Sequence, residues 1–199
     1  LQINDSGVDM YYKSKLVPGA EKMPFQNLLY PILGDKILKI GESNVVGNFS
    51  KQDSVSIFSS SKNHKTSAIV CYESIYGDYV RKFINKGAEG IFIITNDGWW
   101  KNTMGYQQHH IYAKLRAIET RRYIARSANT GISSIINIFG EVKSMIDWDK
   151  KDIIQYTMPL YDQKTFYVKH GDVIGRICSV CGVFILLYFS VSNKLGFSR

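Results

Sequence analysis

Segment 68–77, with the sequence AIVCYESIYG, decides how the rest of this chain is interpreted. Its short apolar run, from Ala68 to Val70, predicts a buried strand that stops at Cys71. From residue 74 onward, apolar and aromatic residues recur at helical spacing, at Ile75, Tyr79, Val80, Phe83 and Ile84. A sharp turn between a strand and a helix is a common way to expose a nucleophile, and the positive end of the helix favours a thiolate there. The alternative at this point is a small, buried, unreactive thiol, which is the commoner state of a lone cysteine.

The hydrophobic pattern along the whole chain predicts alternating strands and helices. Strands are expected at 7–12, 65–70, 90–95, 127–138, 142–146 and 152–158, with shorter ones at 45–49 and 55–58. Helices are expected at 74–85 and 105–127, with a short broken helix at 25–38. The run from Ile91 to Ile94 is continuously apolar, which predicts a strand buried on both faces. One side of the helix at 105–127 collects Ile111, Leu115, Ile118, Arg122 and Ala125. This pattern by itself supports an α/β or α+β fold.

Composition narrows the class of protein. The chain has 199 residues and 45% hydrophobic content, which suits one domain with a sizeable core. The formal net charge is +8, but lysine and arginine form no block and no nucleic-acid-binding motif is present, so we expect no nucleic-acid partner and favour an anionic membrane surface. No spacing typical of a metal site or a cofactor-binding motif is found, so no metal and no cofactor are expected. Cys178 and Cys181 lie in an apolar run, where small residues on a membrane helix are the favoured interpretation.

The C-terminal segment predicts a membrane span. Residues 173–191 are almost wholly apolar, glycine or serine, apart from Arg176, and about 20 such residues cross a bilayer. The alternative is a C-terminal core helix. We therefore divide the chain into a catalytic domain at 1–170 and a transmembrane helix with a short tail at 171–199. The chain begins without methionine and lacks the pattern of a signal peptide, so we expect it to be part of a longer protein.

Several motifs follow one another in a fixed order from residue 11 to the C-terminus. They are Y-x-K-x-x-L at 11–16, L-V-P at 16–18 followed by Glu21 and Pro24, C-Y-E at 71–73, T-N-D-G-W-W at 95–100, Q-H at 108–109 and R-A-x-E-x-x-R-x-x-x-R-x-x-N-x-G at 116–131. Together with the final apolar helix, they resemble the apolipoprotein N-acyltransferase family of the nitrilase (carbon–nitrogen hydrolase) superfamily. In the loop, Gly19-Ala20 replaces the Phe-Gly of that family, and at 98–100 Gly-Trp-Trp replaces Ala-Trp-Phe. The general-base glutamate of the family lies upstream of the first motif, before this chain begins.

The resemblance implies a fold, a site and a reaction. The fold would be part of a four-layer α-β-β-α sandwich, followed by the membrane helix. The catalytic residues would be Cys71, Lys13, Glu73 and Glu21, and the oxyanion and substrate-binding residues would be Tyr72, Trp99 and Trp100. The thiolate would take an acyl chain from a phospholipid as a thioester and pass it to the N-terminal amine of a diacylglyceryl-cysteine apolipoprotein. His109 and His110 point about 100° apart on a helix, so at most one can face the site, and we interpret both as structural.

The resemblance also implies a location, the inner membrane of a bacterium. The full-length protein would cross that membrane several times, with its catalytic domain on the periplasmic side. Two alternatives stay open. The first is a membrane-anchored carbon–nitrogen hydrolase of the amidase or nitrilase type, in which water resolves the thioester. The second is a catalytically incomplete interaction module, because the upstream glutamate is not in this chain.

Overall fold

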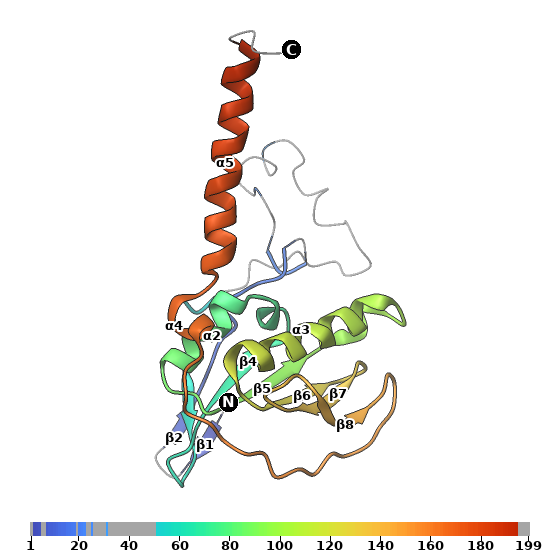
Figure 1. The fold of residues 1–199 in the computed structure, drawn as a ribbon. Coiled ribbons are helices and arrows are strands. Elements are labelled where there is room, and N and C mark those ends of the chain that lie inside the picture. The colour runs from blue at the N-terminus through green and yellow to red at the C-terminus, as the bar shows by residue number, and fades with distance from the viewer. Residues whose placement is uncertain are drawn as a thin grey trace.

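A mixed six-stranded sheet forms the centre of the molecule (Figure 1). The structure is a computed structural model that describes residues 2–4, 7–18, 20–22, 25, 31 and 51–194. The strands are β3 (Ile57–Ser59), β4 (Lys65–Val70), β5 (Gly90–Thr95), β6 (Ile124–Ala128), β7 (Ser133–Ile136) and β8 (Val142–Ile146), and they lie in that order across the sheet. The strands β4, β5 and β6 run parallel, and the other neighbours are antiparallel. A separate two-stranded sheet pairs β1 (Gln2–Asn4) with β2 (Gly7–Asp9).

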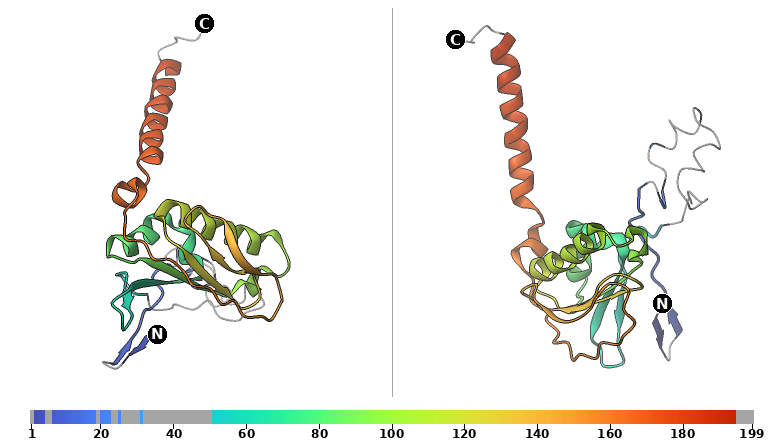
Figure 2. Two further views of the ribbon diagram at one scale, coloured as in Figure 1. Left: turned by 60° about the horizontal axis from the view of Figure 1, so that its bottom comes forward. Right: turned by 90° about the vertical axis from the view of Figure 1, so that its right-hand side faces the viewer.

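Two helices cover one face of the sheet (Figure 2). They are α2 (Gly77–Asn85), which follows β4 through the 3-10 helix η2 (Cys71–Ile75), and α3 (Met104–Thr120), which follows β5 through the 3-10 helix η3 (Asp97–Trp100). Both crossovers connect neighbouring parallel strands in the same direction across the sheet. Because such crossovers are right-handed, both helices are placed on the same face.

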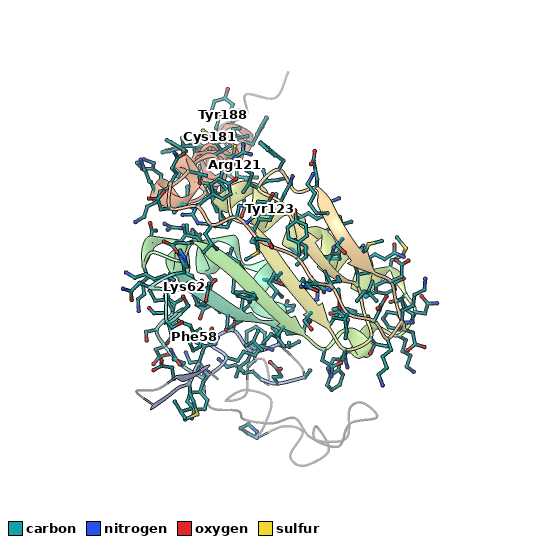
Figure 3. All side chains as sticks on the ribbon, turned by 90° about the horizontal axis from the view of Figure 1, so that it is seen from below. Phe58, Lys62, Arg121, Tyr123, Cys181 and Tyr188 are labelled. Atoms are coloured by element: carbon teal, nitrogen blue, oxygen red, sulfur yellow. The ribbon has the colours of Figure 1, made fainter. Side chains whose placement is uncertain are left out.

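The hydrophobic core lies between the sheet and these helices. It contains Ile69, Ile91, Ile93, Ile124 and Ile136 from the strands, and Tyr79, Val80, Phe83, Ile84, Ala113 and Ala117 from the helices. On the opposite face of β5, Phe92 is 42% exposed and Ile94 is 58% exposed. The expected burial of this strand on both faces is therefore wrong within the part of the chain that the structure describes, because helices cover only one side. Figure 3 shows this open face of the sheet from below.

Several predicted boundaries are corrected. The helix expected at 105–127 ends at Thr120, because Arg121 adopts a left-handed conformation (φ 50°, ψ 47°) and caps it. Residues 122 and 125 therefore belong to the next turn and to β6. The strand expected at 127–138 is two strands separated by a turn, and residues 152–158, all of them described, form no strand. The predicted helix at 25–38 and strand at 45–49 fall almost wholly outside the described residues.

The end of the chain forms α4 (Phe166–His170) and α5 (Val173–Lys194). The helix α4 packs beside α2, whereas α5 points away from the domain (Figure 1). Residues Val173–Ser192 are long enough and apolar enough to cross a membrane, and none of this segment is buried in the described structure. Within the described residues, α5 therefore packs into no core, and the membrane span stays a prediction. Cys178 and Cys181 lie on its exposed surface as free thiols.

Candidate active site

Cys71 occupies a sharp turn at the carboxyl end of β4. Its φ angle is 52°, in the left-handed region that costs a non-glycine residue about 1–2 kcal/mol. This conformation bends the chain from the strand directly into η2, and α2 begins only at Gly77 rather than at residue 74. The thiol is free and half-buried. Strained backbone of this kind persists where the surrounding structure holds it, and it concentrates at functional sites.

Glu73 holds a distant loop against this turn. Its carboxylate is completely buried, and Oε1 accepts hydrogen bonds from the Tyr11 hydroxyl (2.7 Å) and from the backbone N–H groups of Ser14 (2.6 Å) and Lys15 (3.1 Å). The other oxygen, Oε2, accepts from the backbone N–H of Val70 at 2.9 Å. A single side chain therefore connects the residue after Lys13 with the residue before Cys71. These contacts fix the loop of Lys13 relative to the turn of Cys71.

Tyr11 is the second link between the loop and the core. Its hydroxyl donates to Glu73 and lies 2.6 Å from the Tyr79 hydroxyl. Burial, together with the hydrogen bonds to Tyr79 and Glu73, raises the pKa of Tyr11. The phenol therefore stays protonated at neutral pH and remains a donor to the carboxylate. Its ring also contacts Phe83 edge to face, with centroids 5.9 Å apart.

Lys13 and Glu21 form a partly buried ion pair. The Lys13 ammonium donates to both carboxylate oxygens of Glu21, at 2.8 and 2.7 Å. Glu21 also accepts from the backbone N–H of Val17 at 2.8 Å, so its carboxylate is fixed by its own loop. Lys13 is thus paired with Glu21 in a loop that Glu73 ties to the turn of Cys71.

Behind the turn lies a buried polar network that the sequence motifs did not reveal. Asp97 accepts from His109 Nδ1 (2.9 Å) and from Arg126 (2.6 Å), and His109 Nε2 lies 3.0 Å from the Ser74 hydroxyl and 3.3 Å from the Cys71 carbonyl oxygen. The Ser74 hydroxyl itself donates to the Cys71 carbonyl at 2.8 Å. His109 therefore contacts the backbone of Cys71 through this network, which agrees with its interpretation as a structural residue.

Charge within this network is set by burial and pairing. Burial by itself would raise the pKa of Asp97. The hydrogen bond from His109 and the positive charge of Arg126 outweigh this effect of burial, so the pKa of Asp97 is lowered from 3.8 to about 2. His110 points elsewhere, toward the Ser134 hydroxyl at 2.9 Å. Burial and the charges of Arg126 and Lys114 lower the pKa of His110 to about 4, so it is neutral at pH 7.

The sequence contained the parts of the network but not their pairing. Asp97 follows β5, and Arg126 lies on β6, where residue 126 pairs with Ile93. His109 comes from the second turn of α3. Only the register of β5 against β6 and the rotation of α3 bring these three side chains together.

The predicted substrate-binding residues lie at the same edge of the sheet as Cys71. The strands β4 and β5 are parallel neighbours, so their carboxyl ends lie at the same edge of the sheet. The 3-10 helices η2 and η3 begin at those two strand ends, where binding sites of α/β folds are commonly found. Trp99 and Trp100 in η3 are exposed, and Tyr72 is half-buried with its ring 5.5 Å from that of Tyr76. The side chain of Asn96 caps η3 by accepting from the Gly98 N–H at 3.1 Å. Among the described residues, no group of three or more His, Cys, Asp or Glu side chains is arranged to hold a metal ion.

Comparison with known proteins identifies the family. The carbon-nitrogen hydrolase family model matches residues 2–165, and the chain belongs to this family. Similar curated proteins are the apolipoprotein N-acyltransferases of Chlorobaculum tepidum (31% identical over 188 residues, 90% of this chain and 34% of that protein) and Wigglesworthia glossinidia brevipalpis (31% identical, 91% of this chain and 36% of that protein). That of Allorhizobium ampelinum is 33% identical, over 92% of this chain and 33% of that protein. The chain thus spans about a third of the length of these relatives.

Distant similarity to solved structures is also found. The chain is similar to Nit3 of Saccharomyces cerevisiae, a member of the nitrilase superfamily, with a TM-score of 0.46 and 17% identity over 52% of this chain and 40% of that chain. It is also similar to an amidase from Nesterenkonia sp. AN1, with a TM-score of 0.42 and 18% identity over 54% of this chain and 44% of that chain. The family match and the curated relatives confirm the predicted superfamily and its relationship to apolipoprotein N-acyltransferases. The described residues form one mixed sheet covered by helices on one face, and the further layers of the expected α-β-β-α sandwich stay a prediction.

Proposed function

We propose that this chain is the catalytic portion of a membrane-bound apolipoprotein N-acyltransferase, with Cys71 as its nucleophile. The observation that carries the proposal is the Glu73 carboxylate, which ties the loop of Lys13 to the strained turn of Cys71. Acyl transfer requires a group that stabilises the oxyanion near the nucleophile, and the tie through Glu73 fixes the loop of Lys13 relative to the turn of Cys71. The relatives named for this activity support it.

In the first step, the Cys71 thiolate attacks the ester carbonyl of a phospholipid. The C–S bond forms, the ester C–O bond breaks, and a lysophospholipid leaves with a proton. The Lys13 ammonium and the backbone N–H of Tyr72 stabilise the negative charge on the carbonyl oxygen. Glu21 orients Lys13 through their ion pair, and Glu73 positions the loop that carries it. The general base is the glutamate that the family carries upstream of the Y-x-K motif.

In the second step, the free α-amine of a diacylglyceryl-cysteine apolipoprotein attacks the thioester. The C–N bond forms, the C–S bond breaks, and the Cys71 thiol is restored by the proton from the amine. Trp99 and Trp100, exposed beside the carboxyl end of β5, contact the lipid substrates, and Tyr72 closes the acyl pocket. The helix α5 anchors the domain in the bacterial inner membrane, with the catalytic domain on the periplasmic side.

The test supplies the full-length protein with phospholipid and a diacylated lipopeptide and measures N-acylated peptide. Cys71→Ala is expected to abolish transfer, and Lys13→Ala is expected to lower its rate about 10²–10³-fold, the usual cost of losing one oxyanion donor. The matched control is Cys178→Ala, which removes an exposed thiol on α5 and is expected to leave the rate unchanged.

Three results would contradict the proposal. Transfer at the wild-type rate by Cys71→Ala would exclude this thiol as the nucleophile. Release of free fatty acid, without N-acylated peptide, would instead identify a membrane-anchored hydrolase of the amidase or nitrilase type. If neither product forms in the full-length protein, the chain is a catalytically incomplete interaction module.

A further inference from the structure

The helix α3 carries polar side chains on its buried face and large apolar side chains on its exposed face. The buried residues are Tyr106, His109, His110, Ala113, Arg116, Ala117 and Thr120. The outward residues Ile111, Leu115 and Ile118 are 59%, 41% and 42% exposed. Their i, i+4, i+7 spacing makes one continuous stripe, which is the pattern that normally faces a core. An apolar stripe turned outward in this way indicates a partner that is itself apolar.

The stripe continues beyond the ends of the helix. Met104, in the first turn, is exposed, and the Trp100 ring packs against Gly105, where even a Cβ atom would collide with it. At the other end, Gly140 lies against the Ile118 side chain and brings the exposed Phe139 alongside. We call the set Trp100, Met104, Ile111, Leu115, Ile118 and Phe139 the outer α3 surface. A helix of 17 residues is about 25 Å long, so this surface is extended.

The direction of α5 shows what this surface faces. In Figures 1 and 2, α5 leaves the domain on the side of the sheet that α2 and α3 cover, and α3 runs across the direction of α5. A bilayer crossed by α5 would lie roughly perpendicular to that helix. The outer α3 surface then faces the bilayer, with α3 nearly parallel to the membrane plane.

Basic residues border the apolar stripe. Lys101 precedes α3, Lys114 lies on it, and Arg121 caps its C-terminus with its guanidinium 5.3 Å from the centre of the Phe139 ring. The chain as a whole has a formal net charge of +8. Aliphatic and aromatic residues flanked by lysine and arginine are the composition of helices that lie in the interface of anionic membranes.

We propose that the outer α3 surface lies in the interfacial region of the same bilayer that α5 crosses, so that the domain contacts lipid along α3 as well as through its anchor. The proposal rests on the membrane anchorage by α5 in the proposed function. A second copy of the chain fits this surface poorly, because copies anchored in one membrane are related by rotation about its normal. A surface that faces along α5 toward the membrane does not meet its own copy under that rotation.

The test places a polarity-sensitive fluorophore on a single cysteine in the full-length protein. The protein is reconstituted in vesicles of phosphatidylcholine and phosphatidylglycerol, with its other cysteines, including Cys71, replaced by serine. The variant Leu115→Cys carries the probe on the outer α3 surface. The matched control is Lys62→Cys, in the exposed turn between β3 and β4, which is labelled in the view from below in Figure 3. A third variant, Leu186→Cys, places the probe on α5.

Phospholipid brominated on its acyl chains then replaces the ordinary lipid. We expect the probes at residues 115 and 186 to lose fluorescence and the probe at residue 62 to keep it. Quenching at residue 186 without quenching at residue 115 overturns the proposal but leaves the membrane anchor intact. In that case water or another protein segment, rather than lipid, covers the outer α3 surface. Absence of quenching at both residues overturns the anchor and this proposal together. Because Cys71 is replaced throughout, neither result depends on acyl transfer.

Discussion

The helices α2 and α3 cover the same face of the same sheet, yet they are built in opposite ways. In α2, the apolar residues Val80, Phe83 and Ile84 are buried, and charged residues such as Asp78 and Lys82 face outward. In α3, the inward face holds the His109 network and a buried Arg116, and the aliphatic stripe faces outward. A helix next to a core therefore need not point its most apolar side into it. The polar network behind the turn of Cys71 occupies the inward side of α3, and the proposed membrane contact would give its outer side an apolar environment.

The largest expected loss of stability follows from truncating a buried apolar side chain of α2. Phe83 is completely buried and contacts the rings of Tyr11 and Tyr79. Truncation by Phe83→Ala leaves a cavity and is expected to lower the free energy of unfolding by about 3–5 kcal/mol. Urea titration of the detergent-solubilised protein measures this loss, with the exposed neighbour Lys82→Ala as the control, expected within about 0.5 kcal/mol of wild type. Equal effects of the two substitutions would show that α2 is not anchored by its apolar face.

A smaller loss of stability is expected when Asp97, in the polar network under α3, is protonated. This loss depends on pH. The folded-state pKa of Asp97 is about 2, below the ordinary value of 3.8, so its contribution is complete above about pH 4 and disappears as the pH falls through about 2. Over that range the protein is expected to lose about 2 kcal/mol of stability through this group. Unfolding titrations from about pH 5 to about pH 2 measure the loss.

The variants for this measurement are Asp97→Asn, which cannot ionise, and Asp78→Asn, an exposed carboxylate of α2 that pairs with Arg81. We expect the acid-dependent loss to be absent in Asp97→Asn and retained in Asp78→Asn. If Asp97→Asn and wild type lose stability in parallel as the pH falls, the network does not depend on this charge.

The smallest effect on stability is expected on the outer side of α3. Leu115→Gln adds a polar group to an exposed position and is expected to change the free energy of unfolding by less than about 0.5 kcal/mol. The matched change on the buried side is Ala113→Gln, which is expected to cost about 1–3 kcal/mol because it overfills a packed core. Thermal unfolding in detergent compares the two variants. A large loss in Leu115→Gln would mean that the stripe packs against protein in the full-length molecule.

Much of the fold was predictable because its strands and helices follow from hydrophobic patterns within short segments of the chain. The strands at 65–70 and 90–95 are where the apolar runs placed them, since each run is short, apolar and ended by a polar turn. The long apolar segment at the C-terminus predicted α5 for the same reason. The helix at 105–127 was predicted too long, because a left-handed Arg121 gives no signal in the hydrophobic pattern.

The candidate site was predictable only in part. Cys71 came from the strand–turn–helix pattern, and Lys13, Glu21 and Glu73 came from the family resemblance. The structure gives Glu73 and Glu21 specific partners. Their roles in the reaction remain predictions. The network around Asp97 was missed, since its members lie 12 to 29 residues apart and meet only through strand register.

The sequence by itself determined the family, the strand–turn–helix around Cys71 and the membrane-compatible helix, because each depends on residues close together in the chain. The tertiary structure alone decided which side of α3 faces inward, which face of the sheet stays open and which distant loop reaches the cysteine. These features depend on long-range contacts, and the last of them depends on one buried carboxylate, three of whose four partners lie more than 50 residues away.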